Sequence, residues 1–184
     1  MSLRPSLQET RDGGSTILIR LLVGLVVFLP EGIQKLAFPD VLGAGRFATI
    51  GIPLPEVMGP FVGAVEIICG ALIVLGLFTR LAAIPLIVVM AVAIVSTKIP
   101  ILLGHDLWIF HLAAGMKRTG LWSMLHEARN DLTMLLGAVY LLREGSGRWS
   151  LDAHLETGFE SRPSTSPTVV HLASPLDRTF QRTR

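Results

Sequence analysis

A carboxylate inside a long apolar block is the feature of this sequence that most restricts its fold. Residues 61–80 read FVGAVEIICGALIVLGLFTR, which is apolar almost throughout but contains Glu66. Blocks of this kind recur along the 184 residues, of which 51% are hydrophobic and only 16% charged. A soluble domain carries about 25% charged residues, and about 20 apolar residues form a helix long enough to cross a bilayer. We therefore expect an all-α polytopic membrane protein, built as a four-transmembrane-helix bundle in contact with the lipid bilayer.

Apolar blocks and turn residues divide the chain into segments. The predicted spans are residues 16–36, 56–78, 80–97 and 123–142, within a membrane domain of residues 16–153. Glycines and prolines predict a loop over residues 38–55. The apolar patch in residues 98–122 is too short to span, which predicts an interfacial or re-entrant segment.

The two ends of the chain are polar. We expect residues 1–15 to form a polar N-terminal segment and residues 154–184, rich in Ser, Thr, Pro and Arg, to be a disordered tail. The first apolar run lacks the small-residue cleavage site of a signal peptide, so we interpret it as a retained span. Lysines and arginines near the spans do not favour one orientation, and we place both termini on the cytoplasmic side.

Glu66 is the first candidate site residue. Gly59, Gly63, Glu66 and Gly70 share one helix stripe, and glycines on a stripe let a neighbouring backbone come close. Facing lipid would cost about 2.5–3.5 kcal/mol on insertion scales. We therefore expect Glu66 to point into the bundle. It is either a polar clasp between helices or a site for a proton or ligand.

The other candidates are charged residues near the spans. In the first span, Arg20, Glu31 and Lys35 lie close to one helix face and are predicted partners of Glu66. Glu31 and Lys35 are four residues apart, so they form either an interfacial ion pair or part of a polar pocket. Asp131, four residues after Glu127, belongs either to a solvated helix end or to a metal- or proton-binding pair.

Several kinds of chemistry are disfavoured by composition. The only cysteine, Cys69, cannot form an internal dithiol pair. The histidines lack the spacing of a helical metal site, so no haem or metal is expected. A net charge of +2 without a basic stripe argues against nucleic-acid binding.

Three segments together resemble the DoxX family of small bacterial membrane proteins. The first, RLLVGLVVFLPEGIQKL, supplies Arg20, Gly24, Phe28, Gly32 and Lys35. The second, GAVEIICGALIVLGLFTR, supplies Glu66, Gly70, Gly76, Leu77, Thr79 and Arg80. The third, GSGRWSLD, covers residues 145–152. In this order they are similar to the family's pattern over residues 16–153.

The resemblance implies a four-helix bundle in the bacterial inner membrane and a tie to redox metabolism, but no catalytic residue set. We expect an accessory subunit of a redox or quinone-linked system, more a non-catalytic subunit than an enzyme. The sequence leaves the cofactor unknown, with quinone as a candidate, and the candidate partners are a soluble oxidoreductase and further copies of the chain. Arg80 would anchor the turn between the second and third spans. The alternatives are a small carrier or proton-coupled transporter, and a structural scaffold.

Overall fold

Every regular element in the described part of the chain is a helix. The computed structural model describes residues 14–113 and 116–160, where Leu107 and Phe110 form an isolated bridge but no strand is present. The helices are α1 (Thr16–Arg20), η1 (Leu21–Phe28), α2 (Leu29–Ala37), α3 (Pro39–Leu42), α4 (Ala44–Thr49), α5 (Pro55–Leu75), α6 (Thr79–Ala93), η2 (Ile94–Lys98), α7 (Ile99–Leu103), α8 (Leu121–Glu144) and α9 (Leu151–Glu160). The elements η1 and η2 are π-helical, so α1–η1–α2 forms one continuous helix and α6–η2–α7 another.

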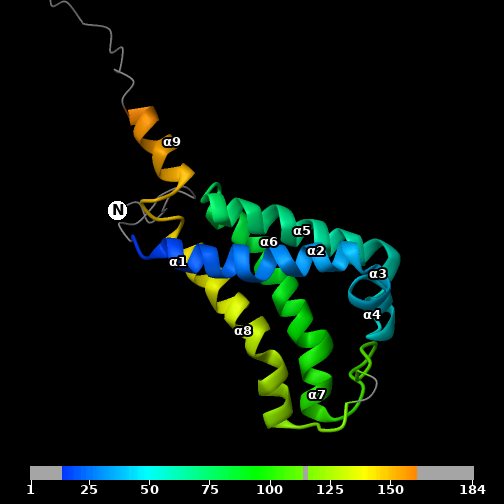
Figure 1. Ribbon diagram of the computed structural model, residues 1–184. Coiled ribbons are helices and arrows are strands. Elements are labelled where there is room, and N and C mark those ends of the chain that lie inside the picture. The colour runs from blue at the N-terminus through cyan, green and yellow to red at the C-terminus, as the bar shows by residue number, and fades with distance from the viewer. Residues whose placement is uncertain (1–13, 114–115, 161–184) are drawn as a thin grey trace, which may run out of the picture.

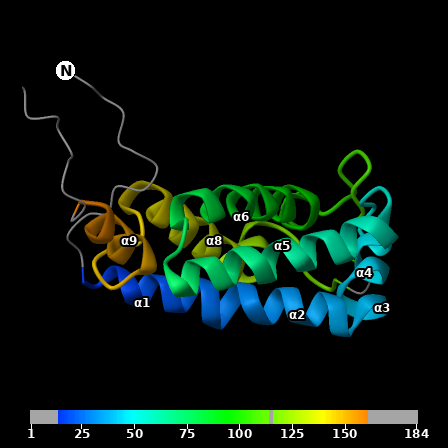
Figure 2. The ribbon, with the colours of Figure 1, turned by 90° about the horizontal axis from the view of Figure 1, so that it is seen from above.

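The long helices pack as two antiparallel pairs. The first helix packs along α5, and α6–η2–α7 packs along α8. The pairs lie together at one end and diverge toward the other (Figure 1). We call these the terminal end, where α1 and α9 begin, and the loop end, where α3, α4 and residues 104–113 and 116–120 lie. The view from above shows the same two ends, with α9 beyond one and α3 and α4 at the other (Figure 2).

Three of these helices are long and apolar enough to cross a membrane: Thr16–Ala37, Pro55–Leu75 and Thr79–Leu103. Helix α8 has 24 residues but is not among them, because its first half carries several charged side chains. A fourth span therefore remains a prediction.

Three boundaries differ from the sequence-based expectations. The third apolar helix continues to Leu103 instead of ending at residue 97. The expected loop of residues 38–55 contains α3 and α4, and α9 covers residues 154–160, where we expected the tail to begin. Residues 161–184 of that tail lie outside the described part of the chain.

Both π-helical segments end two residues before a proline. Pro30 follows η1 and Pro100 follows η2. Proline lacks the N–H of a helical hydrogen bond, and its ring crowds the carbonyl group four residues earlier. The wider π-turn relieves this crowding. We expected a kink at Pro30, and the observed change there is this switch of helix type.

At the terminal end, α5 ends at Gly76, which has a φ of +69°. The N–H groups of Gly76 and Leu77 donate to the carbonyl oxygens of Ile73 (3.1 Å) and Leu72 (2.9 Å), as in a Schellman motif. The buried Arg20 also donates here, from Nε to Ile73 O (2.8 Å) and from Nη2 to Val74 O (2.6 Å). A cation at a helix C-terminus is favoured by the helix dipole, so Arg20 fixes the first helix to the end of α5.

Asp152 closes the same end of the bundle. Its carboxylate accepts the N–H groups of Phe78 (2.8 Å) and Thr79 (3.3 Å), which caps the start of α6. Its own N–H donates to Gly76 O at 2.9 Å. Arg80 donates from Nη2 to the Arg143 carbonyl group at 3.0 Å, which joins α6 to the end of α8. The turn between the second and third apolar helices is therefore held by the residues that leave α8.

Glycines set the distance between the first helix and α5. A Cβ on Gly24 would lie 2.7 Å from the carbonyl oxygen of Gly70, and one on Gly32 would lie 2.6 Å from that of Gly63. These distances leave no room for a side chain. Phe28 lies between these two contacts along the first helix and is fully buried in the apolar core.

We predict that Gly24→Ala destabilises the protein by about 1–2 kcal/mol. Overpacking a core costs about 1–3 kcal/mol, and the better helix propensity of alanine returns about 1 kcal/mol at most. Thermal unfolding in mild detergent measures the change. Gly14→Ala is the control, because its added methyl group would meet no atom closer than 3.8 Å. A Gly24→Ala protein as stable as this control would contradict the proposed backbone contact.

Candidate functional site

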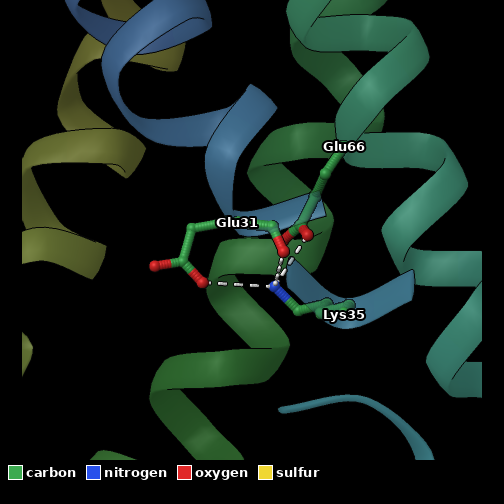
Figure 3. Close-up of polar contacts among 3 residues, drawn as sticks. All are labelled: Glu31, Lys35 and Glu66. Carbon is green, nitrogen blue, oxygen red and sulfur yellow. Dashed lines mark hydrogen bonds and ion pairs between the residues drawn. The ribbon is translucent and has the colours of Figure 1, made fainter. Parts of the chain in front are cut away.

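Three charged side chains from two helices meet inside the bundle. Lys35 Nζ lies 2.7 Å from Glu66 Oε2 and 3.4 Å from Glu31 Oε2, so α2 supplies the cation and one carboxylate and α5 supplies the other (Figure 3). Glu66 is 1% exposed, whereas the Glu31 side chain is 47% exposed. The ammonium group therefore lies between a buried carboxylate and a more accessible one.

The glycine contacts explain how Glu66 reaches this position. Glu66 lies eleven residues after the start of α5, about 16 Å along the helix axis, which is near the middle of a span. A Cβ on Gly32 would lie 3.0 Å from Glu66 Cβ, so the α2 backbone runs directly beside Glu66 at this point. Lys35 follows Gly32 by three residues and shares its side of the helix. The structure thus places Glu66 inside the bundle, as the glycine spacing predicts.

A second ion pair joins the other two helices. Lys98 Nζ of η2 lies 3.0 Å from Asp131 Oδ2 of α8, and both side chains are largely buried, at 10% and 20% exposed. The sequence analysis identified Asp131 but missed Lys98. The signal was present, since Lys98 is the first charged residue after Arg80 in the third apolar helix. Asp131 therefore pairs with a cation from another helix, and Glu127 lines a cavity whose wall also contains Lys98.

The two ion pairs influence each other. Besides the attraction of Lys35, the Glu66 carboxylate experiences repulsion from the charges of both Glu31 and Asp131. These side chains come from both helix pairs, since Glu31 and Glu66 lie on α2 and α5 and Asp131 lies on α8. The charged groups form one cluster within the bundle, which we call the charge cluster: Glu31, Lys35, Glu66, Lys98 and Asp131.

A cavity of about 450 Å³ opens at the loop end, next to the charge cluster. Helices α3, α4 and α8 and the α7–η2 segment contribute to its wall, together with His111, Ala113 and Met116. The polar groups in that wall are Asp40, Arg46, Thr49, Thr97, Lys98, His111 and Glu127. The apolar groups include Val41, Ile50, Ile101 and Met116. Because Lys98 belongs to both the wall and an ion pair, the cavity is in direct contact with the charge cluster.

Residues 105–112 form a turn at the loop end, held by Asp106. Its carboxylate accepts the N–H of Leu112 at 2.8 Å and lies 3.0 Å from Nδ1 of His111. These two hydrogen bonds hold the pKa of the fully exposed Asp106 carboxyl below its ordinary value, with the Leu112 N–H as the larger cause. Trp108 lies in this turn with a φ of +56° and is 88% exposed. Asp106 therefore positions His111, one of the cavity residues.

Arg20 does not join the other predicted site residues. We expected it beside Glu31, Lys35 and Glu66, but its hydrogen bonds run to carbonyl groups at the terminal end, those of Ser146 and Trp149 among them. Arg80 also lies at the terminal end, where we expected it to anchor a turn. Both arginines connect helices there, and the charge cluster is a separate group.

Metal chemistry has no visible ligand set in the described residues. Across residues 14–113 and 116–160, no group of three or more His, Cys, Asp or Glu side chains is placed to hold a metal ion. Cys69 is a buried free thiol within the apolar core.

We predict that Lys35→Met destabilises the protein far more than Glu31→Gln. Removing Lys35 breaks the buried pair with Glu66, which costs up to about 3–5 kcal/mol. The more exposed Lys35–Glu31 contact at 3.4 Å is worth about 0–1 kcal/mol. Thermal unfolding in detergent at pH 7 measures both changes. The Lys35→Met/Glu66→Gln double variant should recover part of the loss, because the buried carboxylate is then neutral and only the more exposed Glu31 lacks its partner. Equal effects of the two single variants would contradict the central place of the Lys35–Glu66 pair.

We also predict that acid loosens the turn of residues 105–112. The pKa of Asp106 is lowered in the folded protein, so its contribution is complete above the ordinary value of about 3.9 and is lost as the pH falls through the lower folded value. Hydrogen exchange, corrected for the intrinsic rate, should show protection of the Leu112 amide at neutral pH. As the pH falls below that ordinary value, the protection should approach the level of Asp106→Asn. Equal exchange of the variant and the natural protein at pH 7 would show that Asp106 does not hold the turn.

Comparison with known proteins agrees with this architecture. A family model described as DoxX matches residues 15–99. The uncharacterized membrane protein Rv3486 of Mycobacterium tuberculosis is 51% identical over 152 residues, which are 82% of this chain and 87% of that protein. No solved structure matches the chain. The chain therefore belongs to the DoxX family of membrane proteins.

Proposed function

We propose that this protein is an accessory membrane subunit of a redox or quinone-linked system in the bacterial inner membrane. Membership of the DoxX family and three apolar helices support an integral membrane protein. The single observation that carries the finer proposal is the loop-end cavity, because its wall combines polar and apolar groups beside lipid-facing helices.

The wall of the cavity has the chemistry that a quinone headgroup requires. A quinone offers two carbonyl oxygens, which accept hydrogen bonds, and a flat apolar ring. Arg46 and Lys98 supply donors, and Ile101 is among the apolar residues that can contact the ring. Leu102 and Leu103, which follow Ile101, are exposed and give an isoprenoid tail an apolar surface on which to lie.

The electrons would come from another protein. The chain has a single cysteine, so it cannot cycle between a dithiol and a disulfide of its own. A soluble oxidoreductase docked at the membrane surface would deliver electrons, and this protein would hold the quinone. This division of roles makes the chain a subunit and not the enzyme.

We propose that α8 crosses the membrane as the fourth span, with both termini on the cytoplasmic side. Its 24 residues are long enough for a bilayer core of about 30 Å. The Lys98–Asp131 pair removes one unpaired charge from its polar half.

We predict that quinone co-purifies with the protein in mild detergent and that Arg46→Gln lowers its occupancy about tenfold. Losing a hydrogen bond from a charged donor costs about 1.5–3 kcal/mol, and about 1.4 kcal/mol is a factor of ten in affinity. Extraction and chromatography of bound quinone measure the occupancy. Arg118→Gln is the control, because Arg118 is an exposed cation of the same end outside the cavity wall.

The same preparation tests the partner, through identification of co-purified proteins and assay of quinone reduction in membranes. A purified protein without quinone or oxidoreductase, together with unchanged quinone reduction after deletion of the gene, would refute the proposed function. Equal loss of quinone in both arginine variants would refute the cavity as its binding site.

A further inference from the structure

We propose that the charge cluster is a proton-binding site, which holds one exchangeable proton at neutral pH and exchanges it through the loop-end cavity. The cluster has three carboxyl groups, Glu31, Glu66 and Asp131, but only two ammonium groups, Lys35 and Lys98. With every group ionised, its net charge is −1. The proton on one carboxyl group makes the cluster neutral.

The five groups count as one unit because short contacts join the members of each ion pair and the charge of Asp131 acts on Glu66 across the two helix pairs. Lys35 contacts two carboxylates, at 2.7 Å and 3.4 Å, and Lys98 contacts the third at 3.0 Å. Asp131 and Glu31 both act on the Glu66 carboxylate, which joins the two ion pairs. A surplus charge on any carboxylate is therefore felt by the others, and one proton relieves all three.

The location of the cluster makes a net charge costly. Glu66, Lys35, Lys98 and Asp131 are largely buried, the Glu31 side chain is 47% exposed, and all five groups lie on the long helices of the bundle. An uncompensated charge in a low-dielectric interior is strongly disfavoured, and such a group is neutralised instead. Both lysines already have carboxylate partners, so no cation of the cluster is left to balance the third carboxylate.

The surrounding charges do not supply the missing positive charge. The cavity wall adds Asp40, Arg46 and Glu127, whose sum is again negative, and His111, which pairs with Asp106 of its own turn. On α8, the exposed Arg129 contacts His126 of its own helix, with Nη1 2.8 Å from the ring Nδ1. Arg20 and Arg80 bond to carbonyl groups at the terminal end. The balance must come from solution.

The cavity gives protons a route to the cluster. Lys98 forms part of the cavity wall and lies 3.0 Å from Asp131, so water in the cavity meets one end of the cluster. Glu66, with 1% exposure, is reached from there through its charged neighbours. This inference does not require a bound quinone, so it stands or falls separately from the proposed function.

Infrared difference spectroscopy of the protein in liposomes tests the proposal directly. A protonated carboxyl group in an apolar setting gives a C=O stretching band that shifts in D₂O, and the area of the band counts such groups. We expect areas in the ratio 1: 0: 2 at pH 7 for the natural protein, Glu66→Gln and Lys35→Met. Removing a carboxyl group makes the cluster neutral, whereas removing a lysine leaves two surplus negative charges.

Asp131→Asn is the second variant, since it neutralises the cluster from the other helix pair and should also abolish the band. It decides the test if Glu66→Gln does not fold, as judged by size-exclusion chromatography. Glu56→Gln is the control, because Glu56 is exposed at the start of α5, and its band should equal that of the natural protein.

Three results would overturn the proposal. The first is the absence of the band in the natural protein at pH 7. The second is a band that persists in Asp131→Asn, which would locate the proton outside the cluster. The third is a band that is lost when sodium replaces a large organic cation in the buffer, which would make the cluster a metal-cation site.

Discussion

The close contact between the backbones of the first helix and α5 is the constraint on which the interior of this protein depends. Gly32 approaches the Gly63 carbonyl so closely that any side chain would collide. The contact brings Lys35 to 2.7 Å from Glu66, and so it converts a carboxylate that would be costly in lipid into half of an ion pair. Packing and electrostatics are thus a single requirement here, because the ion pair could not close across a wider helix interface.

Charged side chains have different partners at the two ends of the bundle. At the terminal end, Arg20 and Asp152 use their charges on backbone groups, where they complete the ends of α5 and α6. The residues that carry the DoxX resemblance therefore include helix caps as well as members of the charge cluster. At the loop end the helix pairs diverge, charged side chains meet one another, and a cavity opens. In the described part of the chain, the loop end is where the charge cluster meets a space that a ligand can enter.

The sequence could predict the features that are determined within one helix, but not those that depend on how two helices pack. Apolar length predicted the three apolar helices, and glycine spacing predicted the inward direction of Glu66, since both follow from helix geometry within one segment. The Lys98–Asp131 pair could not be predicted, because it depends on the register between two helices that are separated by a long loop. Arg20 was assigned to the wrong cluster for the same reason. Its face of the helix was correct, but its partners at residues 73–74 and 146–149 depend on where the helices cross.

Stability alone does not account for five ionisable groups within the bundle. Replacing a buried ion pair with apolar residues of similar volume is often neutral or stabilising by about 1–4 kcal/mol. The contact between the first helix and α5 would persist without charges, because the glycines and the fully buried Phe28 form it. The cluster has more carboxyl groups than ammonium groups and contacts a cavity. Binding of a proton or ligand therefore explains it better than a contribution to stability does.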